Sequence, residues 1–298
     1  MLHLVAIVIP TYKRSASLLR LLRSIEKLET SINYIVIVAE NDCFLQQSLK
    51  MVNKVKKALS FQIEAILVED KNISLVRNVL LSIAFERYNC DFVAMIDDDE
   101  IVSPQWLTAF SECQIKTKAD VIQGNTQPVF IRKERKWMKK VSFYHRDLLV
   151  LNSKSISVST CNVFISKHVY ESMKNNLFDL SFGITGGEDT EFFHRAKKIG
   201  NVCHYCPNAL AYEYYDESRA NIFWVLRRSF RVGRTNYRIF NKNDLKKVLS
   251  TVFILPFTIV RFFLFFWHAN LSIHYLLKLS RQLGLIFEGV QSWGRTKL

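Results

Sequence analysis

Four consecutive carboxylates, Asp97 to Glu100, follow directly on the apolar run Phe92–Ile96. Like charges this close repel one another, and burying even some of them at a strand end costs free energy unless cations or hydrogen-bond donors neutralise them. Mg²⁺ and Mn²⁺ prefer carboxylate oxygens and usually complete their coordination shells with water and substrate phosphates. The run therefore predicts a divalent-cation site that serves a phosphorylated substrate, although an acidic run in isolation is more often a solvated turn.

The residues on either side of the acidic run favour a site over a solvated turn. The run Phe92–Ile96 has the character of a buried strand, and Ser103-Pro104 is expected to cap and begin a helix that carries Trp106 and Phe110 at helical spacing. In open α/β sheets, ligands bind at the carboxyl ends of such strands. A strand and the helix after it would thus position this site.

The first half of the chain alternates between strand and helix patterns. Strands are expected at 4–9, 34–39, 61–68 and 91–96, and helices at 16–28, 44–58 and 74–87, the last capped by Ser74. Such alternation predicts a mainly parallel sheet. Beyond Phe110 the order changes, and apolar segments at 119–123, 127–131, 156–165 and 209–215 predict a mixed sheet edge and a second subsite.

Composition places the chain among globular proteins. With 298 residues, 49% hydrophobic and 23% charged, it can bury one large core or two modest ones. Its six cysteines are scattered, which favours a reducing cytosol, and Cys203-His204-Tyr205-Cys206 has no second pair that would complete a zinc site. No secretory signal is expected, because the N-terminal apolar run is short and stops at Pro10-Thr11.

The formal net charge of +14 would suit either nucleic acid or an anionic membrane. The basic residues concentrate at 132–140 and 219–247, and the second cluster precedes the apolar segment Val248–Trp267. That segment approaches the length of a bilayer span but is interrupted by Pro256 and Arg261. We expect an interfacial or re-entrant membrane helix rather than a buried C-terminal helix pair, with its basic flank on anionic lipid of the cytoplasmic leaflet.

Four motifs, in this order, resemble the family 2 glycosyltransferases of bacteria: Val8–Arg14, Arg77-Asn78, Asp97–Glu100 and Gly186–Phe192. The resemblance covers residues 4–240. It implies the GT-A fold, which is an α/β, Rossmann-like mixed sheet that binds nucleotide sugars and is flanked by helices. It also implies two domains, a catalytic domain at 1–240 and a basic, apolar helical segment at 241–298 that associates with the membrane.

The resemblance implies donor contacts at several strand ends. Pro10, Thr11 and Arg14 would contact the base and ribose. Glu40 stands where relatives read the nucleobase with an aspartate, and Asp42 could substitute if the loop is shifted; uridine is the first choice of base. The other implied donor contacts are Arg77, Asn78, Asp97, Asp98 and Asn162.

The resemblance also implies a cofactor, Mn²⁺ or Mg²⁺. Asp99 resembles the metal ligand that bridges to the diphosphate, and Asp97 the carboxylate near the ribose, so both are candidate metal ligands. A divalent ion would stabilise the charge that develops on the departing nucleoside diphosphate. Many relatives add a histidine, whereas this chain offers Glu213, Tyr214 and Arg219 there, which leaves the third ligand open.

The segment Gly186-Gly187-Glu188-Asp189 resembles the catalytic motif of the family. Asp189 matches the general base, which removes the proton of the acceptor hydroxyl and so implies inversion at the anomeric carbon. Glu188 would bind donor or acceptor hydroxyls, and the sequence leaves an exchange of these roles open. Gly186 and Gly187 permit the close approach of a sugar acceptor.

The expected function is therefore metal-dependent, inverting hexosyl transfer from a nucleotide sugar to a lipid-linked oligosaccharide or other surface glycan. It would take place at the cytoplasmic face of the inner membrane, with the protein peripheral or re-entrant. A degenerate scaffold, a sugar-phosphate nucleotidyltransferase and a basic nucleic-acid-binding protein are the alternatives. This chain lacks the glycine- and lysine-rich phosphate loop that nucleotidyltransferases usually carry near their start. The acidic run would repel nucleic acid, so no nucleic-acid partner is expected.

Overall fold

The computed structural model describes residues 4–145, 157–242 and 244–295. The chain forms two compact units, each built from several stretches of sequence. The first contains Met1–Val129, Arg146–Ile184 and Glu188–Tyr214, and the second contains Phe130–His145, Thr185–Gly187 and Tyr215–Leu298. Short stretches far upstream of residue 240 therefore belong to the same unit as the C-terminal helices.

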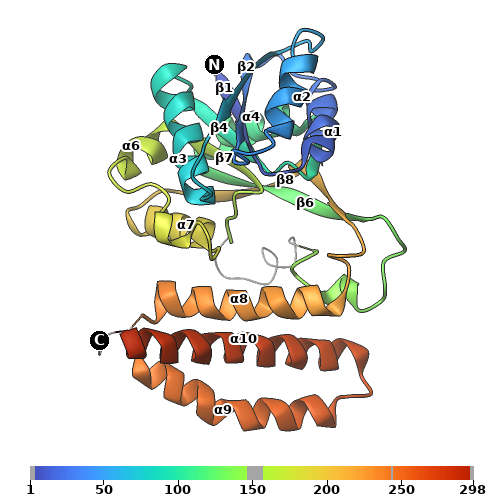
Figure 1. Ribbon diagram of the computed structural model, residues 1–298, viewed down its shortest axis with the longest axis vertical. Coiled ribbons are helices and arrows are strands. Elements are labelled where there is room, and N and C mark those ends of the chain that lie inside the picture. Colours follow the sequence, from blue (N-terminus) through green and yellow to red (C-terminus); the bar gives the residue numbers. More distant parts are fainter. Residues whose placement is uncertain (1–3, 146–156, 243, 296–298) are drawn as a thin grey trace. The chain divides into compact units, whose positions relative to one another are not determined.

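One mixed sheet organises the first unit (Figure 1). Among the described residues it has eight strands in the order β3-β2-β1-β4-β7-β6-β8-β5. The strands are β1 (Val5–Thr11), β2 (Tyr34–Glu40), β3 (Gln62–Leu67), β4 (Phe92–Ile96), β5 (Glu100–Val102), β6 (Val121–Phe130), β7 (Asn162–Ser166) and β8 (Cys203–Tyr215). Strands β1 to β4 pair in parallel, whereas β7 pairs antiparallel to β4 and β6 antiparallel to β7. The predicted parallel sheet with a mixed edge is confirmed.

Helices cover both faces of this sheet. They are α1 (Ser15–Ile25), α2 (Gln47–Val55), α3 (Ile73–Ser82), α4 (Trp106–Thr117), α6 (Lys167–Met173) and α7 (Glu188–Lys198), and a π-helical turn at Ile83–Arg87 extends α3. Strand β1 shows why a continuous apolar run suits a strand here: Ala6 and Val8 join one buried cluster, while Val5, Ile7 and Ile9 join the other. The fold thus has two apolar layers with the parallel strands between them.

Two predicted helix caps are wrong. Helix α4 begins at Trp106, and Ser103 contributes its carbonyl, which accepts from the Trp106 amide, rather than a side-chain cap. Helix α3 is capped by Asn72, whose side chain accepts from the Leu75 amide, while the Ser74 hydroxyl donates to the Asp179 carbonyl. In both places the turn before the helix, which local sequence describes poorly, decides which residue caps it.

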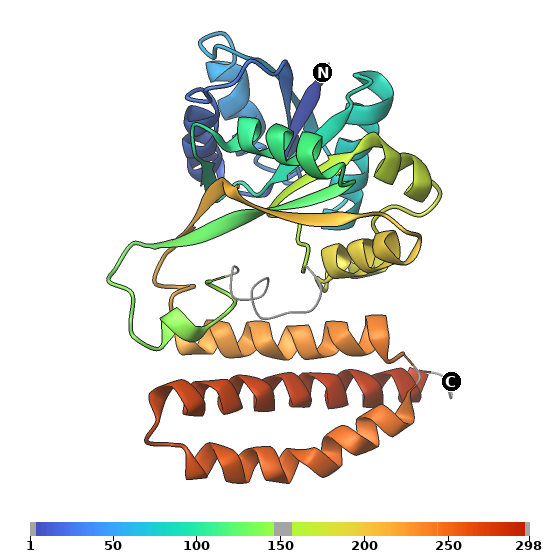
Figure 2. The same ribbon diagram turned by 180° about the vertical axis from the view of Figure 1, so that it is seen from behind.

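Three long helices form most of the second unit: α8 (Ile222–Phe240), α9 (Leu245–Leu264) and α10 (Ala269–Arg295). In both views α10 lies between α8 and α9 (Figures 1 and 2). Helices α8 and α10 approach closely, because a Cβ at Gly233 would lie 2.0 Å from the Arg281 carbonyl oxygen. Two serine hydroxyls form hydrogen bonds between these helices: Ser229 donates to the Leu277 carbonyl, and Ser280 donates to the Leu226 carbonyl.

Helix α9 differs from its neighbours in how little of it is buried. Within the part of the chain that the structure covers, it is the one helix long and apolar enough to cross a membrane. Only 17% of its most apolar 18-residue stretch is buried, whereas the core helix of a soluble protein would be mostly buried. Large apolar side chains such as Phe253, Phe257 and Phe263 are exposed along it. The helix therefore presents an apolar surface that the described part of the chain leaves uncovered.

Candidate active site

The acidic run lies at the carboxyl end of β4, beside the end of β1, and the loop after β1 neutralises part of its charge. The Thr11 hydroxyl donates to Asp98 at 2.8 Å. The Arg14 guanidinium lies 3.2 Å from Asp98 and 2.7 Å from Asp99. Burial raises the pKa of Asp98 to about 6, although Arg14 and the Thr11 hydroxyl act in the opposite direction. Thr11, Arg14, Asp98 and Asp99 thus form one cluster.

A second arginine joins the acidic run to the first turn of α7. Arg77 is buried; its guanidinium lies 3.6 Å from Asp97 and is hydrogen-bonded to Glu188. Burial lowers the pKa of Arg77, but the carboxylates of Glu188, Asp97 and Asp189 outweigh it and raise that pKa above its usual value. Residues more than ninety positions apart in the chain therefore share one electrostatic cluster.

The two carboxylates that begin α7 lie in different surroundings. Glu188 is buried and held by Arg77, and its second oxygen, Oε2, is buried without a hydrogen-bond partner among the described residues. Asp189 is half-buried and, among the residues that the structure describes, accepts hydrogen bonds from the amide and hydroxyl of Thr190 next to it. Asp189 thus lies in the first turn of α7 and remains accessible to a ligand.

The two candidate base contacts after β2 also differ. Glu40 is fully buried, and its Oε2 accepts from the amides of Ser48 and Leu49 at the start of α2, which makes it a helix cap. Asp42 uses Oδ1 for a 3.4 Å contact with the Phe44 amide, while its buried Oδ2 has no hydrogen-bond partner within the described ranges. Each carboxylate thus keeps one buried oxygen without a hydrogen-bond partner among the described residues, Oε1 of Glu40 and Oδ2 of Asp42, although Glu40 also caps α2 through Oε2.

Three other predicted donor contacts take part in holding the fold. Asn162 is buried in β7, donates to the carbonyls of Asn125 and Ala209, and accepts from the Trp106 indole. Asn78 exchanges two hydrogen bonds with the backbone of Phe178. Pro10 is buried within β1, where it pairs with Ala39. Their assignment as donor contacts stays a prediction.

The two glycines before Glu188 belong to the second unit. Gly186 and Gly187 have φ values of 81° and 96°, which glycine adopts without strain. A Cβ at Gly187 would lie 2.2 Å from the Thr235 Cγ2 atom of α8, so the turn requires glycine for packing as well. The structure therefore shows a packing reason for the Gly-Gly pair beside the predicted acceptor contact.

Sequence reasoning missed two residues near these strand ends. Asn41 donates to the carbonyls of Val68 and Asp70 and accepts from the Asn72 amide, so it ties the end of β2 to the start of α3. The Tyr12 ring is partly exposed, with the Lys71 ammonium 4.9 Å from its centroid. The sequence offered one signal for each of them: Asn41 is an asparagine just past a strand, and Tyr12 is an aromatic residue in the first βα loop.

The donor set at the acidic run fits a hard divalent cation. Asp97 and Asp99 are accessible carboxylates, with side chains 35% and 13% exposed. Across the described part of the chain, no three or more His, Cys, Asp or Glu side chains are arranged to hold a metal. Mg²⁺ and Mn²⁺ are commonly held by one or two carboxylates together with water and substrate phosphate, which suits this pair.

The open candidates for a third ligand lie on the neighbouring edge of the sheet. Glu213 is buried on β8, directly opposite Glu100 of β5 in antiparallel register. The Tyr214 amide donates to the Asp99 carbonyl at 3.3 Å, which ties β8 to the acidic run, while Arg219 belongs to the second unit. Glu213 and Tyr214 thus both lie beside the acidic run in the sheet, and the third ligand stays open.

A mixed sheet with carboxylates and arginines gathered at its parallel strand ends defines the class of protein, a glycosyltransferase of the GT-A fold. Two solved structures are similar in fold. S. aureus TarS 1-349 in complex with UDP-GlcNAc has a TM-score of 0.55 and 15% identity, covering 93% of this chain and 91% of that one. The mannosyltransferase PcManGT from Pyrobaculum calidifontis, in complex with GDP-Man and Mn²⁺, has a TM-score of 0.62 and 14% identity, covering 98% and 74%.

Sequence comparison identifies the family of the chain. Residues 3–235 match the model of the family described as "Glycosyltransferase like family 2". The succinoglycan biosynthesis protein ExoM of Rhizobium meliloti (strain 1021) is 33% identical over 205 residues, which are 68% of this chain and 64% of that relative's length. The chain belongs to glycosyltransferase-like family 2, so the predicted family and fold class are confirmed.

Proposed function

We propose that the protein is a metal-dependent, inverting hexosyltransferase that moves a sugar from a nucleotide donor to a lipid-linked or other surface glycan. Family membership supports the transferase class. The name of the ExoM relative, a succinoglycan biosynthesis protein, supports a polysaccharide product. The observation that carries the proposal is the Arg77 bridge, which joins Asp97 to Glu188 next to Asp189 and so supports donor and acceptor chemistry at neighbouring positions.

On the donor side, Asp97 and Asp99 would hold Mn²⁺ or Mg²⁺. The ion would neutralise the diphosphate as it departs. Arg14 now pairs with Asp98 and Asp99, and its side chain is about half exposed, so it can turn toward a diphosphate that brings its own cation. Glu40 through Oε1 or Asp42 through Oδ2 would accept from a uracil N–H, since each of these oxygens has no partner among the described residues, and Glu40 also caps α2.

On the acceptor side, Asp189 would take the proton of the attacking hydroxyl. It is accessible and lies in the first turn of α7, where its carboxylate could meet the acceptor hydroxyl as a general base must. Attack from the face opposite the leaving diphosphate inverts the anomeric centre. Glu188 would orient the sugar through its free Oε2 while Arg77 holds Oε1.

Membrane association would bring the enzyme to a lipid-linked acceptor. Helix α9 presents exposed phenylalanines, and α8 carries five arginines and no acidic residue. Apolar side chains at a membrane surface together with basic groups bind anionic leaflets. We place the protein at the cytoplasmic face of the inner membrane, bound peripherally or by a re-entrant helix.

The test is nucleoside diphosphate release from a panel of UDP-, GDP-, ADP- and dTDP-sugars with Mn²⁺ or Mg²⁺ in detergent. Asp99→Asn should lose release from the preferred donor by at least about 100-fold, and chelation should act in the same way. Glu112→Gln, which changes an exposed carboxylate on α4, is the matched control and should keep full activity. Folded protein that neither binds nor turns over any donor would support the scaffold alternative, and pyrophosphate release would support nucleotidyl transfer.

A further inference from the structure

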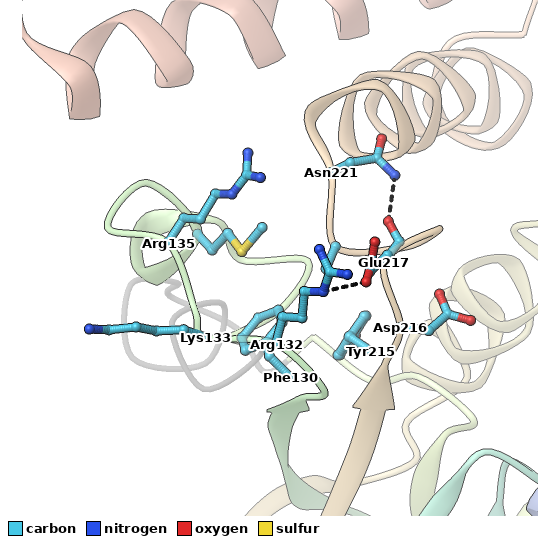
Figure 3. A pocket seen from close by; sticks show the side chains of 10 residues that line it. Phe130, Arg132, Lys133, Arg135, Tyr215, Asp216, Glu217 and Asn221 are labelled. Atoms are coloured by element: carbon cyan, nitrogen blue, oxygen red, sulfur yellow. Dashed lines mark hydrogen bonds and ion pairs between the residues drawn. The ribbon is translucent and has the colours of Figure 1, made fainter.

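A cavity of about 540 Å³ lies in the second unit, between the segment after β6 and the start of α8 (Figure 3). Its apolar wall includes Phe130, Met138 and Tyr215, of which the last two are buried. Three basic residues within four positions, Arg132, Lys133 and Arg135, form one side of it. The cavity therefore combines an apolar wall with a strongly basic edge.

The acidic residues of the cavity are already engaged. Glu217 is paired with the Arg132 guanidinium, as Figure 3 shows. Asp216 accepts from the Ser218 hydroxyl at 2.6 Å and from the Arg219 amide at 3.1 Å. Glu217 is thus neutralised by Arg132, whereas Asp216 keeps its negative charge, held by these donors and by the nearby positive charge of Arg219.

Two cations remain available to a ligand. The side chains of Lys133 and Arg135 are exposed and make no hydrogen bond or ion pair with any described residue. Helix α8, which has 19 residues and is capped by Asn221, begins at the cavity and adds the positive end of its dipole. The uncompensated charge at this place is positive and favours an anionic group such as phosphate.

The same end of the unit also carries uncovered apolar surface. The first turns of α10 contribute Ile273 and Leu277 to the aromatic cluster that contains Tyr215. The chain immediately before α10 exposes Phe265, Phe266 and Trp267, and Trp267 is 85% exposed. A ligand with an anionic head and an apolar tail would therefore meet a basic cavity and an apolar surface on one unit.

We propose that this cavity binds the phosphate or diphosphate ester that joins an acceptor glycan to its carrier lipid. The proposal rests on the proposed function for the identity of the acceptor. Lys133 and Arg135 would contact the phosphate oxygens, and the wall formed by Phe130, Met138 and Tyr215 would take the first apolar atoms of the lipid. The donor diphosphate has its own place at Asp97 and Asp99, so the two anionic groups of the reaction would use separate sites.

The test is binding of geranylgeranyl diphosphate in detergent micelles, with EDTA present so that no metal recruits the diphosphate to the acidic run. The double variant Lys133→Gln/Arg135→Gln should bind at least about tenfold more weakly than the unchanged protein. Lys139→Gln/Lys140→Gln removes the same charge from exposed residues of the same segment that do not line the cavity, and should bind within about twofold.

Each other outcome overturns the proposal. Equal weakening in both double variants would show general attraction to basic charge, and absence of binding would leave the cavity without this ligand. If flotation on phosphatidylglycerol vesicles needs Lys133 and Arg135 while diphosphate binding does not, the cavity binds membrane phospholipid instead. Metal-dependent nucleoside diphosphate release is measured without any lipid, so failure of the proposed function and failure of this inference are separate results.

Discussion

At the scale of single residues, the site depends on two neighbouring carboxylates that the fold treats differently. Glu188 is buried against the Arg77 guanidinium, whereas Asp189 is accessible and accepts hydrogen bonds from Thr190. A buried charge that loses its partner leaves an uncompensated charge behind, which is costly, whereas an exposed carboxylate can be lost at little cost to stability. Substitution of Glu188 should therefore lower stability, whereas substitution of Asp189 should lower activity without lowering stability.

We predict that Asp189→Asn lowers transfer by about 10²- to 10⁴-fold, the usual contribution of a general base, with an unchanged Tm. Glu188→Gln should lower the free energy of unfolding by about 1–3 kcal/mol, because Arg77 stays buried with a weaker partner. Initial rates and chemical denaturation of both variants measure this. Wild-type rates in Asp189→Asn, together with lost activity but full stability in Glu188→Gln, would mean that the roles are exchanged.

At the scale of elements, helix α8 fixes the turn that precedes Glu188. Thr235 packs on Gly187, its hydroxyl lies 3.3 Å from the Gly186 carbonyl, and Arg238 bonds to the Thr185 hydroxyl. Arg238 and Arg234 are paired in turn with Glu288 of α10. Helices α8 and α10 are thus part of the support for this turn.

Gly187→Ala tests that packing. It should cost about 2–4 kcal/mol in unfolding free energy, because the new Cβ meets Thr235 Cγ2 and the residue keeps a left-handed φ. Gly200→Ala is the matched control: its φ is 100°, but nothing lies within 4 Å of its Cβ position, so only about 1–2 kcal/mol is expected.

Thr235→Ser removes the methyl group that the Cβ introduced by Gly187→Ala would strike, so the double variant should recover part of the loss. A double-mutant cycle by urea denaturation measures this coupling, which should be about 1 kcal/mol or more. A cycle with no coupling would contradict the packing explanation and leave backbone conformation as the whole cost.

At the scale of the whole molecule, the exposed apolar face of α9 should decide where the protein resides. Replacing Phe253, Phe257 and Phe263 with serine should reduce binding to anionic liposomes by about 100-fold or more, since each buried phenylalanine contributes about 1.5–3 kcal/mol. Liposome flotation measures it. The control replaces the exposed Ile115, Ile199 and Val202 of the other unit with serine. An equal loss in both triple variants would contradict a role for α9.

The strands and the acidic run could be predicted because their signals are local. A run such as Phe92–Ile96 is apolar throughout only where both faces of a strand are buried, and the carboxylates that follow it must lie at the strand end. Motif order pointed to the family, which the comparison over residues 3–235 confirms. The two helix caps failed because they depend on backbone angles in the turn before the helix rather than on residue type alone.

The sequence by itself determined which residues could do chemistry: the acidic run, the basic clusters and the apolar segment that became α9. Only the tertiary structure decided their partners. It assigned Arg77 to Asp97 and Glu188, used Glu40 as the cap of α2, and built a basic cavity from the segments that follow β6 and precede α8. The partners of Glu40 lie eight and nine residues away, and Glu188 lies 111 residues from Arg77. They come together through backbone geometry, chain topology and packing, which periodicity and local propensity do not encode.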